Sequence, residues 1–314
     1  MLTMNAFGFR ADQKITDFIK SHKFTLSAEI IPARNGTEQK AVLNQIEALI
    51  KHGAQFLSVT KGAGGSLRGG SLPIAQTVKE NFGVPCVAHF TCRDLTPHEV
   101  ENQLIDHHYF GIRNILALRG DPPMSQTEWR AKPGSHEYAY QLIEQIRKLN
   151  AGQYLVREGF NSPDQGIEKT DFCIGAAVYP EHPNPKERGE FFKQKIDAGA
   201  EYAISQMLFD VDAYSDFMDQ CGKFGINVPI LPGTRILKSK KQAATMASRF
   251  QVSVPKWLMD RLPDSTSSKS TDAQIQDLFS ELVEKFQKRG APGVHLFILS
   301  DTDGSCQLIR KLLS

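Results

Sequence analysis

Residues 113–119 read RNILALR, an apolar run that ends in an arginine and leads directly into Gly120 and Asp121. A short run that is apolar on both alternating faces is typical of a strand buried on both sides, as in a parallel sheet. Seven other runs of this kind occur along the chain. They are FTLSAEII (24–31), QFLSVT (55–60), PCVAHFTC (85–92), DFCIGAAVY (171–179), EYAISQM (201–207), VPILPG (228–233) and GVHLFIL (293–299).

Each of these runs is followed by a stretch with the spacing of a helix. The expected helices cover 37–52, 72–81, 96–108, 135–149, 187–198, 211–223, 238–249 and 302–313. A doubly wound open sheet also alternates in this way, but eight units of similar spacing favour a closed (β/α)8 TIM barrel. We predict one barrel domain over residues 1–314, with an extra N-terminal helix at 11–22. A polar, flexible insert, PDSTSSKSTDAQ (263–274), is expected before the last helix-strand unit.

The composition excludes several classes of protein. The 37 basic and 35 acidic residues give a formal charge of +2, without the basic excess of a dedicated nucleic-acid binder. The start of the chain lacks the apolar core of a secretion signal, and no run is long enough to span a membrane. Five scattered cysteines without a CxxC pair argue against disulfides or structural zinc. We therefore expect a cytoplasmic protein.

The barrel prediction points to the residues at the ends of the strands, because chemistry in such barrels lies where strands pass into the following loops. Polar residues occur there in otherwise apolar surroundings. They are Glu29, Thr60, His89 to Cys92, Arg119 to Asp121, Tyr179, Gln206, Pro232-Gly233 and Leu299-Ser300.

Glu29, in SAEIIPAR, is the most informative of these residues. Burial of an unpaired, charged carboxylate costs on the order of several kcal/mol. This cost favours the protonated form and raises the pKa of the group toward neutrality. A raised pKa suits a general acid. The alternative is a structural ion pair with Arg34 or another cation. The residues alone leave both interpretations open.

The other candidates also have two interpretations. The loop SVTKGAGGS (58–66) fails the dinucleotide fingerprint because Leu67 stands at the third glycine position. Its glycines either let the backbone come close to a flat ring or a phosphate, or form a plain turn. His89 is a hydrogen-bonded core residue or a ligand contact, and nothing around it suggests a metal site. Gln206 needs partners for its amide, and Tyr179 begins a proline-rich loop that is either a clamp or a stiff connection.

Arg119-Gly120-Asp121 matches an adhesion tripeptide, but it also fits an active-site turn at the end of a barrel strand. Adhesion requires secretion, and the sequence shows no signal for it. The active-site interpretation is therefore favoured.

In this order the motifs resemble the methylenetetrahydrofolate reductases, a family of flavin-dependent barrel enzymes. The resemblance covers residues of about 24 to 300, and NILALRGDPP is its most specific part. The other motifs are SAEIIPAR, SVTKGAGGS, VAHFTC with Arg93, HEYA (136–139), AAVYPEHP, KIDAGAEYAISQMLFD, PILPG and GVHLFIL.

The resemblance implies that NADH or NADPH reduces a bound FAD. The reduced flavin then passes hydride to 5,10-methylenetetrahydrofolate, which becomes 5-methyltetrahydrofolate for methionine synthesis. It implies a homo-oligomer, Glu29 as the general acid that helps open the folate's five-membered ring, and Asp121 as a charge beside flavin and folate. The implied FAD contacts are Thr60, Ala63, His89, Arg119, Gly120, Asp121, Tyr138, Ala139, Tyr179, His182 and Lys195. The implied substrate contacts are Gln206, Asp121 and Phe209, with Met246 as the alternative to Phe209.

Some positions depart from the family pattern. Lys61 replaces the aromatic residue of the common VTYGA motif, which suggests a changed flavin wall. Asp301 stands where a basic folate-binding residue is often found, and Arg235, in the altered PGTRIL segment, is a candidate for the missing charge. Residues 183–195 align poorly with the family's FAD-adenosine contacts. The alternatives are therefore a flavin-free reductase on the same scaffold and another flavin-dependent barrel oxidoreductase.

Overall fold

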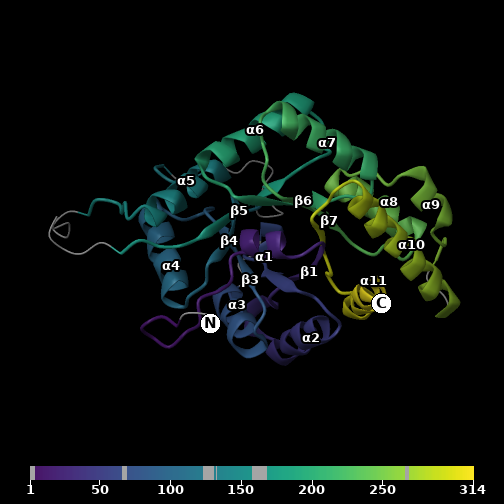
Figure 1. Cartoon of the computed structure of the whole chain (residues 1–314), viewed down its shortest axis with the longest axis horizontal. Helices are drawn as coiled ribbons and strands as arrows, with labels where there is room; N and C mark the ends of the chain where they lie inside the picture. The colour runs from purple at the N-terminus through teal and green to yellow at the C-terminus, as the bar shows by residue number, and fades with distance from the viewer. Residues whose placement is uncertain (1–3, 66–68, 123–130, 132, 158–167, 266–268) are drawn as a thin grey trace.

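The computed structural model describes residues 4–65, 69–122, 131, 133–157, 168–265 and 269–314. Eight parallel strands close into a barrel in chain order, β1 to β8, and β8 pairs with β1 (Figure 1). The barrel prediction is confirmed, and the open sheet is excluded. The strands are β1 Thr25–Ile30, β2 Phe56–Val59, β3 Cys86–Thr91, β4 Asn114–Leu118, β5 Cys173–Val178, β6 Tyr202–Met207, β7 Ile230–Thr234 and β8 Gly293–Leu296.

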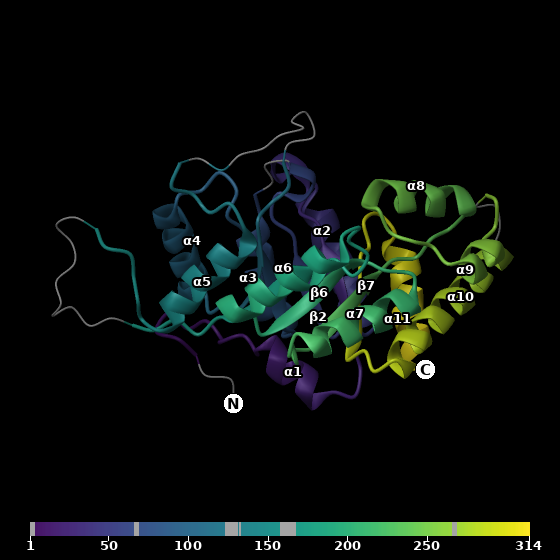
Figure 2. The ribbon, with the colours of Figure 1, turned by 90° about the horizontal axis from the view of Figure 1, so that it is seen from above.

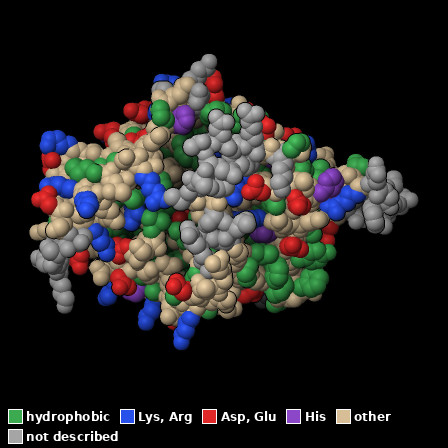
Figure 3. All heavy atoms as spheres, turned by 180° about the vertical axis from the view of Figure 1, so that it is seen from behind, with side chains coloured by type: hydrophobic (Ala, Val, Ile, Leu, Met, Phe, Trp, Pro, Cys, Tyr) green, Lys and Arg blue, Asp and Glu red, His purple; other side chains and the backbone are tan. Residues whose placement is uncertain are grey.

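The helices lie around the strands, except the first, which lies across one end of the barrel (Figure 1). They are α1 Ile15–Ser21, α2 Gln39–Lys51, α3 Ser71–Thr77, α4 Pro97–Tyr109, α5 Ala139–Asn150, α6 Pro185–Ala198, α7 Val211–Lys223, α8 Lys240–Phe250, α9 Lys256–Arg261, α10 Lys269–Lys288 and α11 Thr302–Leu313. Within the described ranges, no helix combines the length and the apolar character needed to cross a bilayer. On the face shown in Figure 3, basic and acidic side chains are interspersed, in keeping with the nearly balanced charge.

Two apolar clusters stabilise the barrel, because the side chains of each strand alternate between its interior and the helices. The larger cluster lies between strands and helices. The smaller fills the interior and includes Phe56, Leu116 and Tyr202. Ile15 and Phe18 of α1 belong to this inner cluster, so the extra N-terminal helix closes the barrel at the end where the strands begin (Figure 2).

Helices α9 and α10 were not expected from the sequence. The polar stretch 263–274, expected as a flexible insert, ends inside α10, which begins at Lys269. Residues 266–268 lie outside the described part. The physical reason for α10 is its apolar face, which packs into the outer cluster and contains Ile275, Leu278, Phe279, Leu282, Val283 and Phe286.

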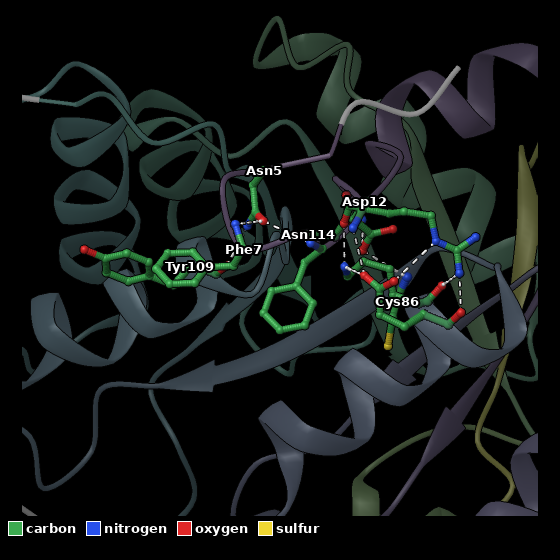
Figure 4. A network of polar contacts seen from close by, with 10 residues as sticks. Asn5, Phe7, Asp12, Cys86, Tyr109 and Asn114 are labelled. Atoms are coloured by element: carbon green, nitrogen blue, oxygen red, sulfur yellow. Dashed lines mark hydrogen bonds and ion pairs between the residues drawn. The ribbon is translucent and has the colours of Figure 1, made fainter.

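A buried polar network ties the N-terminal segment to the closed end of the barrel (Figure 4). The Asp12 carboxylate accepts hydrogen bonds from the Cys86 backbone N–H (3.2 Å) and from Asn114 Nδ2 (3.0 Å). Asn114 Oδ1 in turn accepts from the backbone N–H of Ile15 (2.8 Å), at the start of α1. Burial raises the pKa of Asp12 to about 7, although these hydrogen bonds and the charge of Lys79 act to lower it.

Candidate active site

Glu29 is enclosed at the carboxyl end of β1. Only 8% of the residue is exposed. In the described part of the chain, no side chain pairs with its carboxylate, and burial raises its pKa to about 8. An ion pair would instead lower the pKa, so the geometry favours the general-acid interpretation over the structural pair.

Two further buried polar groups lie at the ends of the neighbouring strands. Thr60 follows β2 directly, and His89 is on β3. Thr60 Oγ1 and His89 Nε2 are both buried without a hydrogen-bond partner among the described residues. Burial also lowers the pKa of His89 to about 3, so the ring is neutral at pH 7. Because buried polar atoms are rarely left unpaired, these two are suited to a bound molecule.

A polar layer that the sequence did not reveal lies below Glu29 in the barrel. His295 of β8 contacts Ser27 Oγ through Nδ1 (2.8 Å) and Ser58 Oγ through Nε2 (3.0 Å). Ser27 is two residues before Glu29 on β1, and Ser58 is two residues before Thr60, so each pair points to the same side. Burial, with the nearby His89, lowers the pKa of His295 to about 3. His295 is therefore a neutral link that fixes β1, β2 and β8 beneath the mouth.

Asp121 lies at the mouth on the loop that follows β4. Its Oδ2 accepts a hydrogen bond from the backbone N–H of Gly64 (3.2 Å), which joins the loops after β2 and β4. Gly120 has a φ of +98°, and an added Cβ would lie 2.8 Å from Arg93 Cβ and 3.3 Å from Thr91 Cβ. Glycine is thus required by packing against the end of β3 and by the left-handed backbone. Arg119-Gly120-Asp121 is part of the barrel mouth.

The end of β5 brings an aromatic and a cationic side chain close to Arg119 and Asp121. Lys195 of α6 donates a hydrogen bond to the Ala177 carbonyl (2.7 Å), and its Nζ lies 5.6 Å from the centre of the Tyr179 ring. Burial and the charge of Arg119 lower the pKa of Lys195 to about 8. Desolvation and the charge of Asp121 raise the pKa of Tyr179, whereas Arg119 lowers it, although 48% of this residue is exposed. Arg119, Asp121, Tyr179 and Lys195 are therefore close enough to affect one another electrostatically.

The remaining expected FAD contacts lie on loops and helix starts around the same end. Ala63 begins a short 3-10 turn after β2, and Ala139 is the first residue of α5. Tyr138 precedes it, is largely exposed and stacks on Tyr140 with ring centres 5.7 Å apart. His182 follows β5, and its backbone carbonyl accepts a hydrogen bond from Arg188 (2.8 Å).

The two expected substrate contacts on and after β6 differ. Gln206 is half-buried at an irregularity in the pairing of β6 with β7, and its Oε1 accepts from the backbone N–H of Met207 (2.8 Å). Phe209 has no exposed surface and belongs to the outer apolar cluster, between barrel and helices. The structure therefore does not offer Phe209 to a ligand, contrary to the expectation from the sequence.

Lys61, at the position where a changed flavin wall is expected, contacts the helix layer. Its Nζ donates to Gln103 Oε1 of α4 (2.6 Å) and lies 3.9 Å above the centre of the Phe90 ring. Burial lowers the pKa of Lys61 to about 8, whereas Cys92 acts to raise it. Because Lys61 follows the inward Thr60, it points behind β3, so its side chain forms no wall of the mouth.

Comparison with known proteins agrees with this geometry. The sequence model of the family described as methylenetetrahydrofolate reductase matches residues 14–312. The chain belongs to the methylenetetrahydrofolate reductase family. It is therefore an oxidoreductase of folate-dependent one-carbon metabolism, and the resemblance found in its motifs is confirmed.

Named relatives of the family occur in bacteria and plants. The 5,10-methylenetetrahydrofolate reductase of Escherichia coli (strain K12) is 30% identical over 300 residues, covering 92% of this chain and 91% of the relative. Methylenetetrahydrofolate reductase (NADH) 1 of Arabidopsis thaliana is 28% identical and covers 95% of this chain, which spans 50% of that longer protein. A solved structure from Clostridium thermocellum, described as binding two copies of 5-methyl-5,6,7,8-tetrahydrofolic acid, has 17% identity and a TM-score of 0.56 over 94% of this chain and 98% of its own. That likeness supports the fold.

Proposed function

We propose that this member of the family reduces 5,10-methylenetetrahydrofolate to 5-methyltetrahydrofolate, with hydride from NADH or NADPH passed through bound FAD. The observation that carries the proposal is Glu29. Its carboxyl group is enclosed at the barrel mouth, unpaired among the described side chains, and has a pKa of about 8. It therefore holds a proton at neutral pH in the place where a substrate would enter.

The proton on Glu29 has a defined use in this reaction. The methylene carbon of the substrate bridges two nitrogens, and protonation of one of them lets its C–N bond break. The carbon then becomes an electrophilic iminium that accepts hydride. A carboxylic acid of pKa about 8 gives up its proton to a nitrogen within reach, and enclosure keeps water from competing. Gln206, half-buried at the end of β6, would bind the amide-like pyrimidine edge of the folate.

The residues at the mouth fit a flavin. Thr60 Oγ1 and His89 Nε2 are buried without partners, and both can hydrogen-bond a heterocycle. Space beside Gly64 is open, because an added Cβ would meet no atom within 4 Å. When bound, FAD would take hydride from the nicotinamide and deliver it to the folate. The side chains that would hold it are Thr60, His89, Arg119, Asp121, Tyr138, Tyr179, His182 and Lys195, with backbone contacts from Ala63, Gly120 and Ala139.

Asp121 has an electrostatic part in this proposal. Its carboxylate is fixed at the mouth by the Gly64 N–H, close enough to Tyr179 to raise the pKa of that phenol. A negative charge there disfavours further negative charge on a reduced ring and so favours release of hydride. The cations Arg119 and Lys195, which are close enough to affect one another, would offset the charge of phosphates.

An anaerobic experiment in two half-reactions tests the proposal. Purified protein is first mixed with NADH while the flavin absorbance is recorded, and methylenetetrahydrofolate is then added. The expected result is bleaching of a yellow protein by NADH and recovery of the colour on addition of the folate. A colourless protein that still oxidises NADH with the folate would identify the flavin-free reductase. A bleached protein that the folate fails to reoxidise would identify another flavin-dependent oxidoreductase.

A further inference from the structure

Arg93 lies at the barrel mouth, two residues after the end of β3. Only 9% of its side chain is exposed, although arginine is mostly a surface residue. Its backbone N–H donates to the carbonyl of Arg119 (2.9 Å), which continues the pairing of β3 with β4 into the two loops. The Cβ of Arg93 also packs against the backbone of Gly120. Arg93 is therefore in direct contact with the turn that leads into Asp121.

The guanidinium of Arg93 reaches from the loop after β3 to the loop after β2. Its Nε donates to Asp94 Oδ2 (2.8 Å), and its Nη2 donates to the backbone carbonyl of Gly65 (3.4 Å). Its Nη1 is also buried, without a hydrogen-bond partner among the described residues. The ion pair with Asp94 offsets the charge of the guanidinium, which argues against a separate site for an anion. The contact with Gly65 points instead to a role in holding the loop.

The turn that Arg93 contacts, residues 62–65, also holds Asp121. The Gly65 N–H donates to the Gly62 carbonyl (3.1 Å), and the Gly64 N–H donates to Asp121 Oδ2 (3.2 Å). Gly62, Gly64 and Gly65 have φ values of +68°, +67° and +70°. Glycines permit this left-handed backbone, but they also leave many other conformations accessible. The turn therefore depends on contacts from outside to keep one conformation.

Few other contacts of this kind are available to the turn. An added Cβ at Gly64 would meet no atom within 4 Å, so packing does not restrain the backbone there. The direction of the Gly64 N–H, which fixes the Asp121 carboxylate, follows from the conformation of the whole turn. Arg93 thus acts on this carboxylate from two sides, through Gly65 on one loop and through Gly120 on the other.

We propose that Arg93 is a positioning residue that holds the turn 62–65 and thereby keeps the Asp121 carboxylate beside the flavin. This inference rests on the proposed function, because it takes a flavin to be the group next to Asp121. Without the guanidinium fork, the turn samples other conformations and the Gly64 N–H leaves the carboxylate. The negative charge then turns toward water and acts more weakly on the flavin, so the midpoint potential rises.

The flavin midpoint potential of Arg93→Lys, measured on the purified holoenzyme by spectroscopic titration, tests this inference. Lysine keeps the positive charge but lacks the planar fork that contacts Asp94 and Gly65 together. The potential is expected to rise, by less than it does in Asp121→Asn. In the double variant, Arg93→Lys is expected to leave the potential of Asp121→Asn unchanged, because the charge that Arg93 positions is absent.

Hydrogen exchange and a matched variant complete the test. The amides of residues 62–65, followed by mass spectrometry, are expected to exchange roughly 3- to 10-fold faster in Arg93→Lys, the range for loss of one ordinary hydrogen bond. Arg113 also donates to a backbone carbonyl, that of Asp12 (3.3 Å), and pairs with Asp171 (3.2 Å), but at the closed end of the barrel. Arg113→Lys is expected to change neither the potential nor the exchange of the turn.

The possible results separate this inference from the proposed function. An unchanged potential in Arg93→Lys overturns the inference, even where the turn exchanges faster, because the turn then does not set the charge beside the flavin. An equal rise with and without the Asp121 carboxylate also overturns it, since Arg93 then acts on the flavin directly. Both results leave the proposed function standing when the folate still reoxidises the reduced protein. A protein that binds no flavin overturns the proposed function, and this inference with it.

Discussion

The buried Asp12 makes the stability of the fold depend on pH. Its pKa is about 7 in the folded state and 3.8 in an exposed reference, so the folded state binds an additional proton between these values. The free energy of unfolding then falls as pH rises from about 4 to about 7, with a slope of about 1.4 kcal/mol per pH unit, and levels off above that. Over the whole interval the loss is about 4 kcal/mol.

The substitution Asp12→Asn removes this titration and keeps the geometry. The amide oxygen can still accept from the Cys86 N–H and Asn114 Nδ2. From pH 5 to pH 7, the wild type is expected to lose about 2 kcal/mol more unfolding free energy than the variant, because the slope halves as the pH reaches the folded-state pKa. Urea unfolding, followed by circular dichroism at each pH, gives these free energies. Glu29 also titrates in this range, but it is present in both proteins and cancels in the difference.

A matched variant separates burial from a simple change of net charge. Asp17→Asn makes the same chemical change on the exposed side of α1. The plot of its unfolding free energy against pH should run parallel to that of the wild type. If the Asp12→Asn curve is also parallel to the wild type across pH 5–8, burial of this carboxyl does not govern the pH dependence, and the reasoning is refuted.

Three further predictions concern the mouth. Glu29→Gln removes the proposed general acid, so it should slow reoxidation of the reduced protein by methylenetetrahydrofolate about 100- to 10,000-fold in stopped flow. The half-reaction with NADH should stay nearly intact. Equal slowing of both half-reactions would contradict the role of Glu29. Asp121→Asn should raise the flavin midpoint potential in a spectroscopic titration, since a negative charge is removed beside the ring; an unchanged potential would count against this electrostatic part. Gly120→Ala should lower the unfolding free energy by roughly 1–3 kcal/mol in urea, because its Cβ would lie 2.8 Å from Arg93 Cβ at a φ of +98°; full stability would show that the end of β3 can move aside.

The sequence predicted the barrel because each strand carries its own local signal. It did not predict α10, although Ile275, Phe279, Leu282 and Phe286 recur at helical spacing. Only the polar residues 269–274 of this stretch lie in the helix, and they form its first turns. A helix that starts within a polar stretch is decided by the packing of its later turns, which local composition does not report.

The residues of the candidate site also differ in how far the sequence alone could predict them. Glu29 could be found because a carboxylate inside an apolar strand is unusual by itself. His295 could not, because its partners Ser27 and Ser58 are far away in the sequence and meet it only when β8 closes against β1. Phe209 was implied as a substrate contact by the family resemblance, but it is buried in the outer apolar cluster, which depends on the path of the chain after the irregular pairing with β7.

How closely a position follows the family pattern depends on the physical requirement at that position. In the proposed function a general acid has to reach one nitrogen within hydrogen-bond distance, so Glu29 would have little freedom of position. A charge that attracts a flexible tail acts over several ångströms, so a residue in such a role has more freedom of position. Lys61 points behind β3 and is constrained by α4 instead of by a ligand. Residues that touch the reacting atoms are therefore expected to keep their places among relatives, whereas residues that supply charge at a distance are expected to move between loops.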